Sequence, residues 1–243
     1  MKFNIPICIF FCLLYLIEAK AQSIPKQQIR NTYTWVSLNS NWYLKPKFFL
    51  VGDIHIREND FFTSNSFYFG RIGIGYQINE KLNSTVGYAV LLSTNSDDVA
   101  PINNVENRIH QQISLNSKMG KFSLFQRWRN ELRWQNQYIH NEKIGSTKFS
   151  DRIRYLLSLN FQLFKNKKLP QITCSNELMF QFGNNLSNNI FDQNRAFIGI
   201  KQNITKSLSY DFGYMYIYQS KVSSNIINHG DIMRLFFYYS LKK

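Results

Sequence analysis

The sequence predicts an all-β fold: a closed antiparallel up-and-down transmembrane β-barrel of about 12 strands, with roughly 10–14 as the range. Three observations carry this prediction. Apolar and polar residues alternate with a period of about two along almost the whole chain. Most alternating runs span roughly 10–15 residues, enough for the about 9–11 residues with which a tilted strand crosses a bilayer. The connections between runs are alternately short and long, as in outer-membrane barrels.

The first 21 residues have the layout of a secretory signal peptide. Met1 and Lys2 give a basic start, residues 5–17 are apolar apart from Pro6, and Ala19 and Ala21 form a small-residue cleavage site. The apolar run is too short for a membrane-spanning helix, which needs about 20 residues. We therefore expect residues 1–21 to be removed on export and residues 22–243 to form one outer-membrane barrel domain.

The composition of the expected mature chain excludes several classes of protein. Of 29 basic and 15 acidic residues, Lys2, Lys20 and Glu18 fall in the signal peptide, which leaves 27 against 14, a net charge of +13. Cys174 is then the single cysteine, so no intrachain disulfide can form. No later segment holds 18 consecutive apolar residues, which excludes a helical membrane protein. The full sequence holds 14 tyrosines and 21 phenylalanines but only 5 prolines, a composition that favours strands.

Eleven runs of alternation are expected as strands, because turn residues separate them. In chain order these are 33–44, 47–57, 66–78, 82–94, 105–116, 122–135, 149–163, 171–183, 191–203, 208–219 and 231–241. The connections at 79–81, 117–121, 164–168 and 204–207 are short, and those at 58–65, 95–104, 136–148, 184–190 and 220–230 are longer and polar. Short turns are periplasmic and long loops external in outer-membrane barrels, so the alternation also predicts orientation.

Several runs separate a charged face from an apolar face. In RWRNELRW (residues 127–134), every odd position is charged, and the even positions include Trp128 and Trp134. On a strand the two sets point to opposite faces. In 152–163, Arg152 and Arg154 begin one face while the other face is wholly apolar. The sequence therefore predicts two different environments on the two sides of the sheet.

The distribution of the cations places the charged face inside the barrel. Ten of the eleven arginines, all but Arg30, lie within or at the end of expected strands, whereas most lysines lie at turns. Arginine suits a crowded, hydrogen-bonded setting better than lysine does. Acidic residues share the arginine face: Glu106 with Arg108, and Glu131 with Arg129 and Arg133. We expect a lumen-lining polar network, with Tyr, Phe and Leu facing lipid. Its expected members are Asp53, Arg57, Glu106, Arg108, Arg127, Arg129, Glu131, Arg133, Arg152, Arg154, Glu177, Arg195, Asp211 and Arg234.

The expected number of strands is odd, which conflicts with the even strand numbers of bacterial barrels. Eleven strands with the C-terminus in the periplasm would place the N-terminus outside, whereas single-chain bacterial barrels have even strand numbers. Either residues 25–32 add a twelfth strand, or one segment has been split or merged elsewhere.

Short motifs along the chain carry a family resemblance. They are Trp35, Glu106 to Arg108 with Gln111 and Gln112, Arg127 to Arg133, Arg152 to Arg154, Asn176 with Glu177, Phe191 to Arg195, Gly199, and Gly213 with Tyr214. In these residues the chain resembles the domain-of-unknown-function 2490 family, a set of uncharacterised bacterial outer-membrane barrel proteins. The resemblance covers most of the mature chain in order. It implies the fold and the location, and it brings no established activity.

The sequence shows no clear catalytic or metal-binding pattern. A lipid-hydrolysing barrel needs a serine nucleophile and a histidine base within hydrogen-bond reach, yet none of the 4 histidines has a serine two positions away. Ser114 shares a face with His110 but lies roughly 13 Å along the strand, although pairing across strands could still form a dyad. We attribute Asp53 and His55 to a lumen hydrogen bond with Arg57 rather than to a metal site, and we expect no cofactor.

These observations predict a non-enzymatic outer-membrane barrel of a Gram-negative cell, with a lipid- or envelope-modifying hydrolase as the alternative. The lumen arginines have two interpretations: the wall of a narrow channel that favours small anionic solutes, or a network that fills the barrel and fixes its register. About twelve strands lie between side-chain-filled barrels near eight and open ones near 16–18. Outer-membrane lipid is the expected partner; nucleic acid is not, because an exported chain holds its arginines within strands. The sequence does not determine the oligomeric state.

Overall fold

The computed structural model describes residues 27–59, 64–95, 102–139, 142–166, 169–183, 190–221 and 226–241. The expected signal peptide, residues 1–21, lies outside the described residues. Within these ranges no helix is long and apolar enough to cross a membrane.

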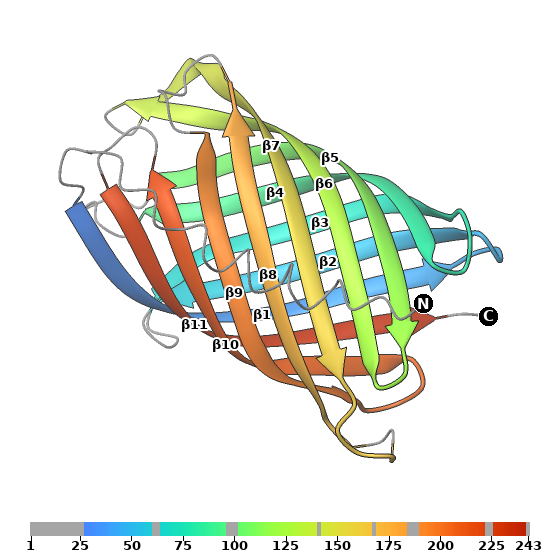
Figure 1. Cartoon of the computed structure of the whole chain (residues 1–243). Helices are drawn as coiled ribbons and strands as arrows, with labels where there is room; N and C mark the ends of the chain where they lie inside the picture. The colour runs from blue at the N-terminus through green and yellow to red at the C-terminus, as the bar shows by residue number, and fades with distance from the viewer. Residues whose placement is uncertain are drawn as a thin grey trace.

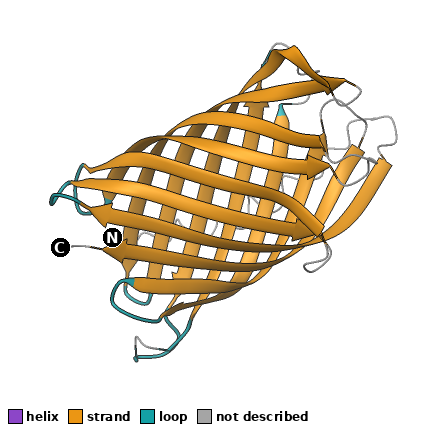
Figure 2. Ribbon diagram, turned by 180° about the vertical axis from the view of Figure 1, so that it is seen from behind, coloured by secondary structure: helices purple, strands orange, loops and turns teal. Residues whose placement is uncertain are grey.

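The described chain forms a closed barrel in which each strand lies beside its neighbour in sequence (Figures 1 and 2). Ten neighbouring pairs are antiparallel. The strands are β1 (Gln27–Tyr43), β2 (Phe48–Asn59), β3 (Ser64–Gln77), β4 (Leu82–Asn95), β5 (Ile102–Met119), β6 (Phe122–Ile139), β7 (Glu142–Phe161), β8 (Gln171–Phe182), β9 (Phe191–Asn203), β10 (Leu208–Lys221) and β11 (Ile226–Leu241).

The predicted barrel and its eleven segments are confirmed, and the main differences lie at the ends of strands. The hairpin of β6 and β7 continues to Ile139 and Glu142, so most of the loop expected at 136–148 is strand. Strand β11 begins at Ile226, within the loop expected at 220–230. These strand ends are rich in polar residues, so alternation with apolar residues is weak there, and backbone pairing with the neighbouring strand extends the sheet.

The seam of the barrel corrects the expectation of an even strand number. Strand β1 pairs with β11 in parallel, from Gln27 opposite Ile226 to Trp42 opposite Leu241. A parallel pair closes an odd number of strands, because the first and last strands then run in the same direction. Residues 27–32 accordingly extend β1 and do not form a twelfth strand.

The connections fall into two sets at opposite ends of the barrel. The end that carries the β1–β2, β3–β4, β5–β6, β7–β8 and β9–β10 connections is called the short-turn end below, because the sequence predicts four of its connections as short turns; the connections at the opposite end are of similar length in the structure. Local side chains build two of its turns: the Asn79 side-chain oxygen accepts from the backbone N–H of Leu82 (2.9 Å), and Thr205 Oγ1 accepts from that of Leu208 (2.9 Å). Gly120 supplies the positive φ (56°) of the tight β5–β6 turn.

The two faces of the barrel differ as the alternation predicts. The outer face exposes apolar side chains around the cylinder, including Ile54, Ile72, Val86, Ile198 and Phe212. The even positions of RWRNELRW lie on this face, where Trp128 is 42% exposed, whereas Arg129 on the inner face is 5% exposed.

Paired glycines allow close approach of the backbone on the inner face. Gly73 lies opposite Gly87, and Gly199 lies opposite Gly213. A Cβ at Gly73 would lie 3.1 Å from the Cα of Gly87, and a Cβ at Gly199 would lie 2.9 Å from the Cα of Gly213. The sheet can therefore curve tightly at these two places.

Candidate functional site

The inner wall of β5 to β9 holds a dense group of ion pairs, which we call the arginine cluster. It contains seven arginines and four carboxylates, each with an opposite charge within 4.0 Å. The members are Arg108, Arg127, Arg129, Arg133, Arg152, Arg154 and Arg195, with Glu106, Glu131, Glu177 and Asp192. The arginine cluster therefore has an excess of three positive charges.

Glu131 on β6 lies at the centre of the arginine cluster. Its carboxylate oxygens lie 2.5 Å from Arg152 Nη2 and 2.8 Å from Arg154 Nη1 on the neighbouring strand β7. Arg129 and Arg108 approach more loosely, at 3.5 and 3.8 Å. The side chain of Glu131 is only 3% exposed, so four guanidinium groups replace the water that would otherwise solvate it.

Glu177 and Glu106 extend the arginine cluster to both sides of Glu131. Glu177 on β8 accepts two hydrogen bonds from Arg154, at 2.8 and 3.0 Å, and one from Arg127 at 2.6 Å. Since Arg127 is on β6, this contact passes over the intervening strand β7. Glu106 accepts from Arg108 (2.7 Å) and from Arg133 (2.6 Å).

A β-bulge brings a further carboxylate into the arginine cluster. The register of β8 and β9 shifts between Met179 and Phe180, so Asp192 has no opposite residue on β8. Asp192 is buried and lies 3.2 Å from Arg152 Nη1. Asp192 is not a member of the network that the sequence predicts, because strict alternation assigns it to the outer face.

Two smaller ionic groups lie elsewhere on the inner wall. Arg234 on β11 donates two hydrogen bonds to Asp211 on β10, at 2.7 and 3.0 Å, and Tyr238 donates to the same carboxylate (2.6 Å). Asp53 on β2 forms an ion pair with Arg71 on β3. Arg71 and Tyr238 were also absent from the predicted network.

The sequence-predicted site residues lie on the inner wall, but several of their partners differ from those expected. Arg133 pairs with Glu106 across the β5–β6 ladder, although Glu131 was its expected partner. Asp53 pairs with Arg71, although Arg57 was expected, and the Arg57 guanidinium lies 3.6 Å from the ring centroid of Trp35. Shared faces can be read from alternation, whereas partners depend on the cross-strand register.

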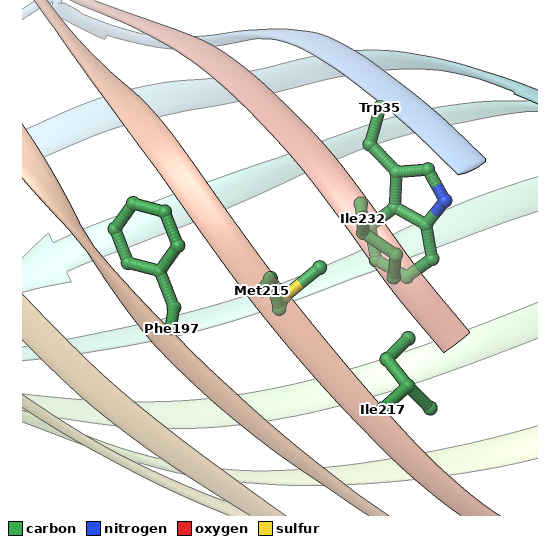
Figure 3. Packing of buried hydrophobic residues seen from close by; sticks show 5 residues of the cluster. All are labelled: Trp35, Phe197, Met215, Ile217 and Ile232. Carbon is green, nitrogen blue, oxygen red and sulfur yellow. The ribbon is translucent and has the colours of Figure 1, made fainter. Parts of the chain in front are cut away.

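An apolar cluster fills the inner wall of β1, β9, β10 and β11. It consists of Trp35, Phe197, Met215, Ile217 and Ile232, shown in Figure 3. These are inward-facing positions that an open aqueous lumen would fill with polar residues. Arg195 of the arginine cluster lies over Trp35, with its Cζ 5.0 Å from the ring centroid, so the two clusters are in contact.

Inward-pointing side chains on four strands are almost fully withdrawn from water, and we call this group the waist of the barrel. Met179 on β8 is fully buried, and Ile232 on β11, Glu131 on β6 and His110 on β5 are 1%, 2% and 3% exposed. Arg108 on β5 also reaches Phe69 on β3, with its Cζ 5.5 Å from the ring centroid.

A cavity of about 960 Å³ lies between the waist and the short-turn end. Its mouth includes Lys81, Lys118 and Lys206, which lie in or beside the short turns. Its wall also includes Lys201 and the carboxylates Asp53, Glu80, Glu177 and Asp211. Nine arginines line it: Arg57, Arg71, Arg108, Arg127, Arg129, Arg152, Arg154, Arg195 and Arg234. The cavity is therefore strongly cationic.

The histidines and carboxylates suggest no metal centre. Among the described residues, no three His, Cys, Asp or Glu side chains gather in a way that could hold a metal ion. His55 packs edge-on against the rings of Phe69 and Phe236, at centroid distances of 5.2 and 5.5 Å. His229 contacts the hydroxyl of Tyr216 at 2.5 Å.

One ion pair on the outer face provides a contrast to the lumen. Arg30 on β1 lies 2.5 Å from Asp231 on β11, and the Arg30 side chain is 72% exposed. Tyr214 donates a hydrogen bond to the same carboxylate (2.5 Å). Exposed pairs of this kind contribute little to stability.

Comparison with known proteins yields a family and a distant structural likeness. The family model described as "Protein of unknown function (DUF2490)" matches residues 32–228. No curated protein matches the chain. The crystal structure of the β domain of the Bordetella autotransporter BrkA is similar over 79% of this chain and 83% of that chain, with 8% sequence identity and a TM-score of 0.44. That likeness is too distant to support an argument about function.

Proposed function

The chain belongs to the DUF2490 family, whose function is not established, and we propose that it is an outer-membrane β-barrel closed to ions at its waist. In this proposal it is a non-enzymatic structural or binding protein and not a channel. The single observation that carries the proposal is the burial of the waist, where Met179 and Ile232 have 0% and 1% of their surface exposed.

The outer face supports the membrane location. Ile54, Ile72 and Ile198 are 63%, 65% and 57% exposed, and a soluble protein seldom exposes so continuous an apolar surface. Hydrocarbon is the natural solvent for such a band. The short-turn end would then face the periplasm, as in other outer-membrane barrels. Fractionation of a Gram-negative host, with protease digestion from outside intact cells, tests both location and orientation.

The waist supports the closed state. The contacts that cross it are charge-assisted hydrogen bonds and tight apolar packing, both of which resist the entry of water. An ion would have to displace several guanidinium–carboxylate pairs at once. The arginine cluster therefore acts as a plug made from the wall itself.

Planar-bilayer recording of the purified protein tests this proposal. We expect no steady single-channel conductance in about 1 M salt, a concentration at which exposed charges are largely screened and would not repel an entering ion. A known porin in the same bilayers is the control for insertion. Steady openings that prefer anions would overturn the proposal and favour the channel interpretation.

The absence of enzymatic activity is part of the same proposal and is tested separately. Labelled phospholipid or lipid A is incubated with the purified barrel, and released acyl chains are measured. We expect release no faster than with heat-unfolded protein. Release above that level would replace the structural role with a lipid hydrolase.

A further inference from the structure

Among the residues that the structure describes, the arginine cluster has fewer carboxylates than guanidinium groups. Its seven guanidinium groups face four carboxylates, and six of the seven arginines line the cavity at the short-turn end. Uncompensated charge inside a barrel that is surrounded by lipid is unfavourable. An anion from outside the chain would neutralise the excess positive charge.

Part of the arginine surface is available to such an anion. The side chains of Arg127, Arg195 and Arg234 are 17%, 13% and 13% exposed, and all three line the cavity. They belong to β6, β9 and β11, so they converge on the cavity from different parts of the wall. Each has a planar set of N–H donors that fits the oxygens of a phosphate group.

The mouth and the aromatic part of the wall define the kind of anion. Lys81, Lys118 and Lys206 are exposed at the mouth, where they would attract anions from the short-turn side. The half-buried rings of Phe125 and Phe236 line the cavity as well and offer apolar surface for the rest of a ligand. The volume of about 960 Å³ is in the range of sites for small organic molecules, about 300–1,000 Å³.

We infer that this cavity is a binding site for an organic phosphate that enters from the short-turn end. The phosphate oxygens accept hydrogen bonds from Arg127, Arg195 and Arg234, and the apolar part of the ligand lies against the phenylalanine rings. A phosphate is favoured because it carries nearly two charges and three acceptor oxygens at neutral pH. No covalent step is involved.

This inference deepens the proposed binding role, but its test is separate from that of the closed waist. A barrel that conducts ions and still binds phosphate at these arginines would contradict only the closed waist. A barrel that is closed and binds no phosphate would contradict only the inference.

The binding test uses the full-length mature barrel in a zwitterionic detergent without phosphate. Inorganic pyrophosphate is titrated in a calorimeter, and glycerol phosphate is titrated in parallel. We expect saturable binding of both that weakens as salt is raised, because the attraction is electrostatic. Absence of saturable pyrophosphate binding at low salt would overturn the inference.

Matched substitutions locate the binding. Arg127→Gln and Arg234→Gln should each weaken pyrophosphate binding about tenfold, since each removes a charge-assisted hydrogen bond. Arg30→Gln on the outer face makes the same chemical change and should alter binding by less than about twofold. Equal weakening by Arg30→Gln would contradict binding in the cavity. Heat-modifiable migration in electrophoresis shows whether each variant is folded.

Charge reversal at the mouth provides a test that does not touch the arginine cluster. The triple variant Lys81→Glu, Lys118→Glu, Lys206→Glu should slow pyrophosphate association several-fold, because steering acts mainly on the association rate. These side chains are exposed, so the variant is expected to fold. An unchanged association rate would contradict entry from this end.

A competition arm distinguishes the source of the phosphate. Short-chain phosphatidic acid in mixed micelles presents the same group on a lipid. If it displaces pyrophosphate from the wild type but not from Arg127→Gln, the site accepts a lipid headgroup. If pyrophosphate and glycerol phosphate bind and the lipid does not, the ligand is a soluble phosphate ester.

Discussion

The two sides of the inner wall hold their side chains in place by different means. On β5 to β9 the arginine cluster joins strands through ion pairs as short as 2.5 Å. On β1 and β9 to β11 the apolar cluster of Trp35, Phe197, Met215, Ile217 and Ile232 does so by packing. The apolar side needs no partner of defined charge, whereas each buried ion on the other side depends on its neighbours.

This difference indicates which side of the wall fixes the register of the strands. Packing tolerates substitutions that preserve volume, so the apolar side accepts several residue types at one position. The ionic side requires particular pairs, such as Glu131 with Arg152 and Glu177 with Arg154, and a shift of one residue would place every charge of the shifted strand on the outer face. The arginine cluster therefore fixes the register in addition to filling the lumen.

The largest effect is expected at the centre of the ionic side. Glu131→Gln removes one carboxylate and leaves four arginines without their shared partner, so the barrel should lose about 3–5 kcal/mol of unfolding free energy. Urea unfolding in detergent micelles measures the loss. Glu80→Gln, in an exposed turn, is the matched control. Equal stability of the two variants would remove the structural role of the arginine cluster.

A smaller effect is expected on the apolar side. Ile232→Ala leaves a cavity beside Met215 and Trp35 and should cost about 2–4 kcal/mol. The same substitution at Ile54, which is 63% exposed on the outer face, should cost less in the same unfolding experiment. If Ile54→Ala were the more damaging change, the assignment of inner and outer faces would be wrong.

The smallest effect within the lumen is expected at the edge of the arginine cluster. Asp192→Asn weakens only the contact with Arg152, which keeps Glu131 as a second partner at 2.5 Å. We expect a loss of about 1–2 kcal/mol, because a neutral amide can still accept a hydrogen bond. Arg30→Gln on the outer face should leave the unfolding midpoint unchanged. A change at Arg30 larger than at Asp192 would contradict the difference between the two faces.

Most of the fold could be predicted because alternation with period two is a local property of the chain. It gave eleven segments, and the charged rows that begin with Arg127 and Arg152 lie inward as predicted. The prediction was weakest where both faces are polar, as at Glu142 to Phe149 of β7, because a strand without contrast has no visible period.

The pairs within the site could not be predicted in the same way. Sequence neighbours on one face suggested Glu131 for Arg133, but the β5–β6 register places Arg133 beside Glu106. Asp192 was missed because a bulge reverses its expected face, and a bulge has no signature in the alternation itself. Arg71 was not included in the predicted network. It lies at an inward position of β3, but the glycines around it weaken the alternation of polar and apolar residues.

The sequence by itself determined the class of the fold, the approximate course of each strand and the side on which most side chains lie, because these follow from the two-residue repeat of a strand. Only the tertiary structure decided the parallel seam of β1 with β11, the partners of each arginine and the burial of the side chains at the waist. These depend on how far each strand slides against the next and on where the sheet meets itself. Both are long-range quantities that no short stretch of sequence contains.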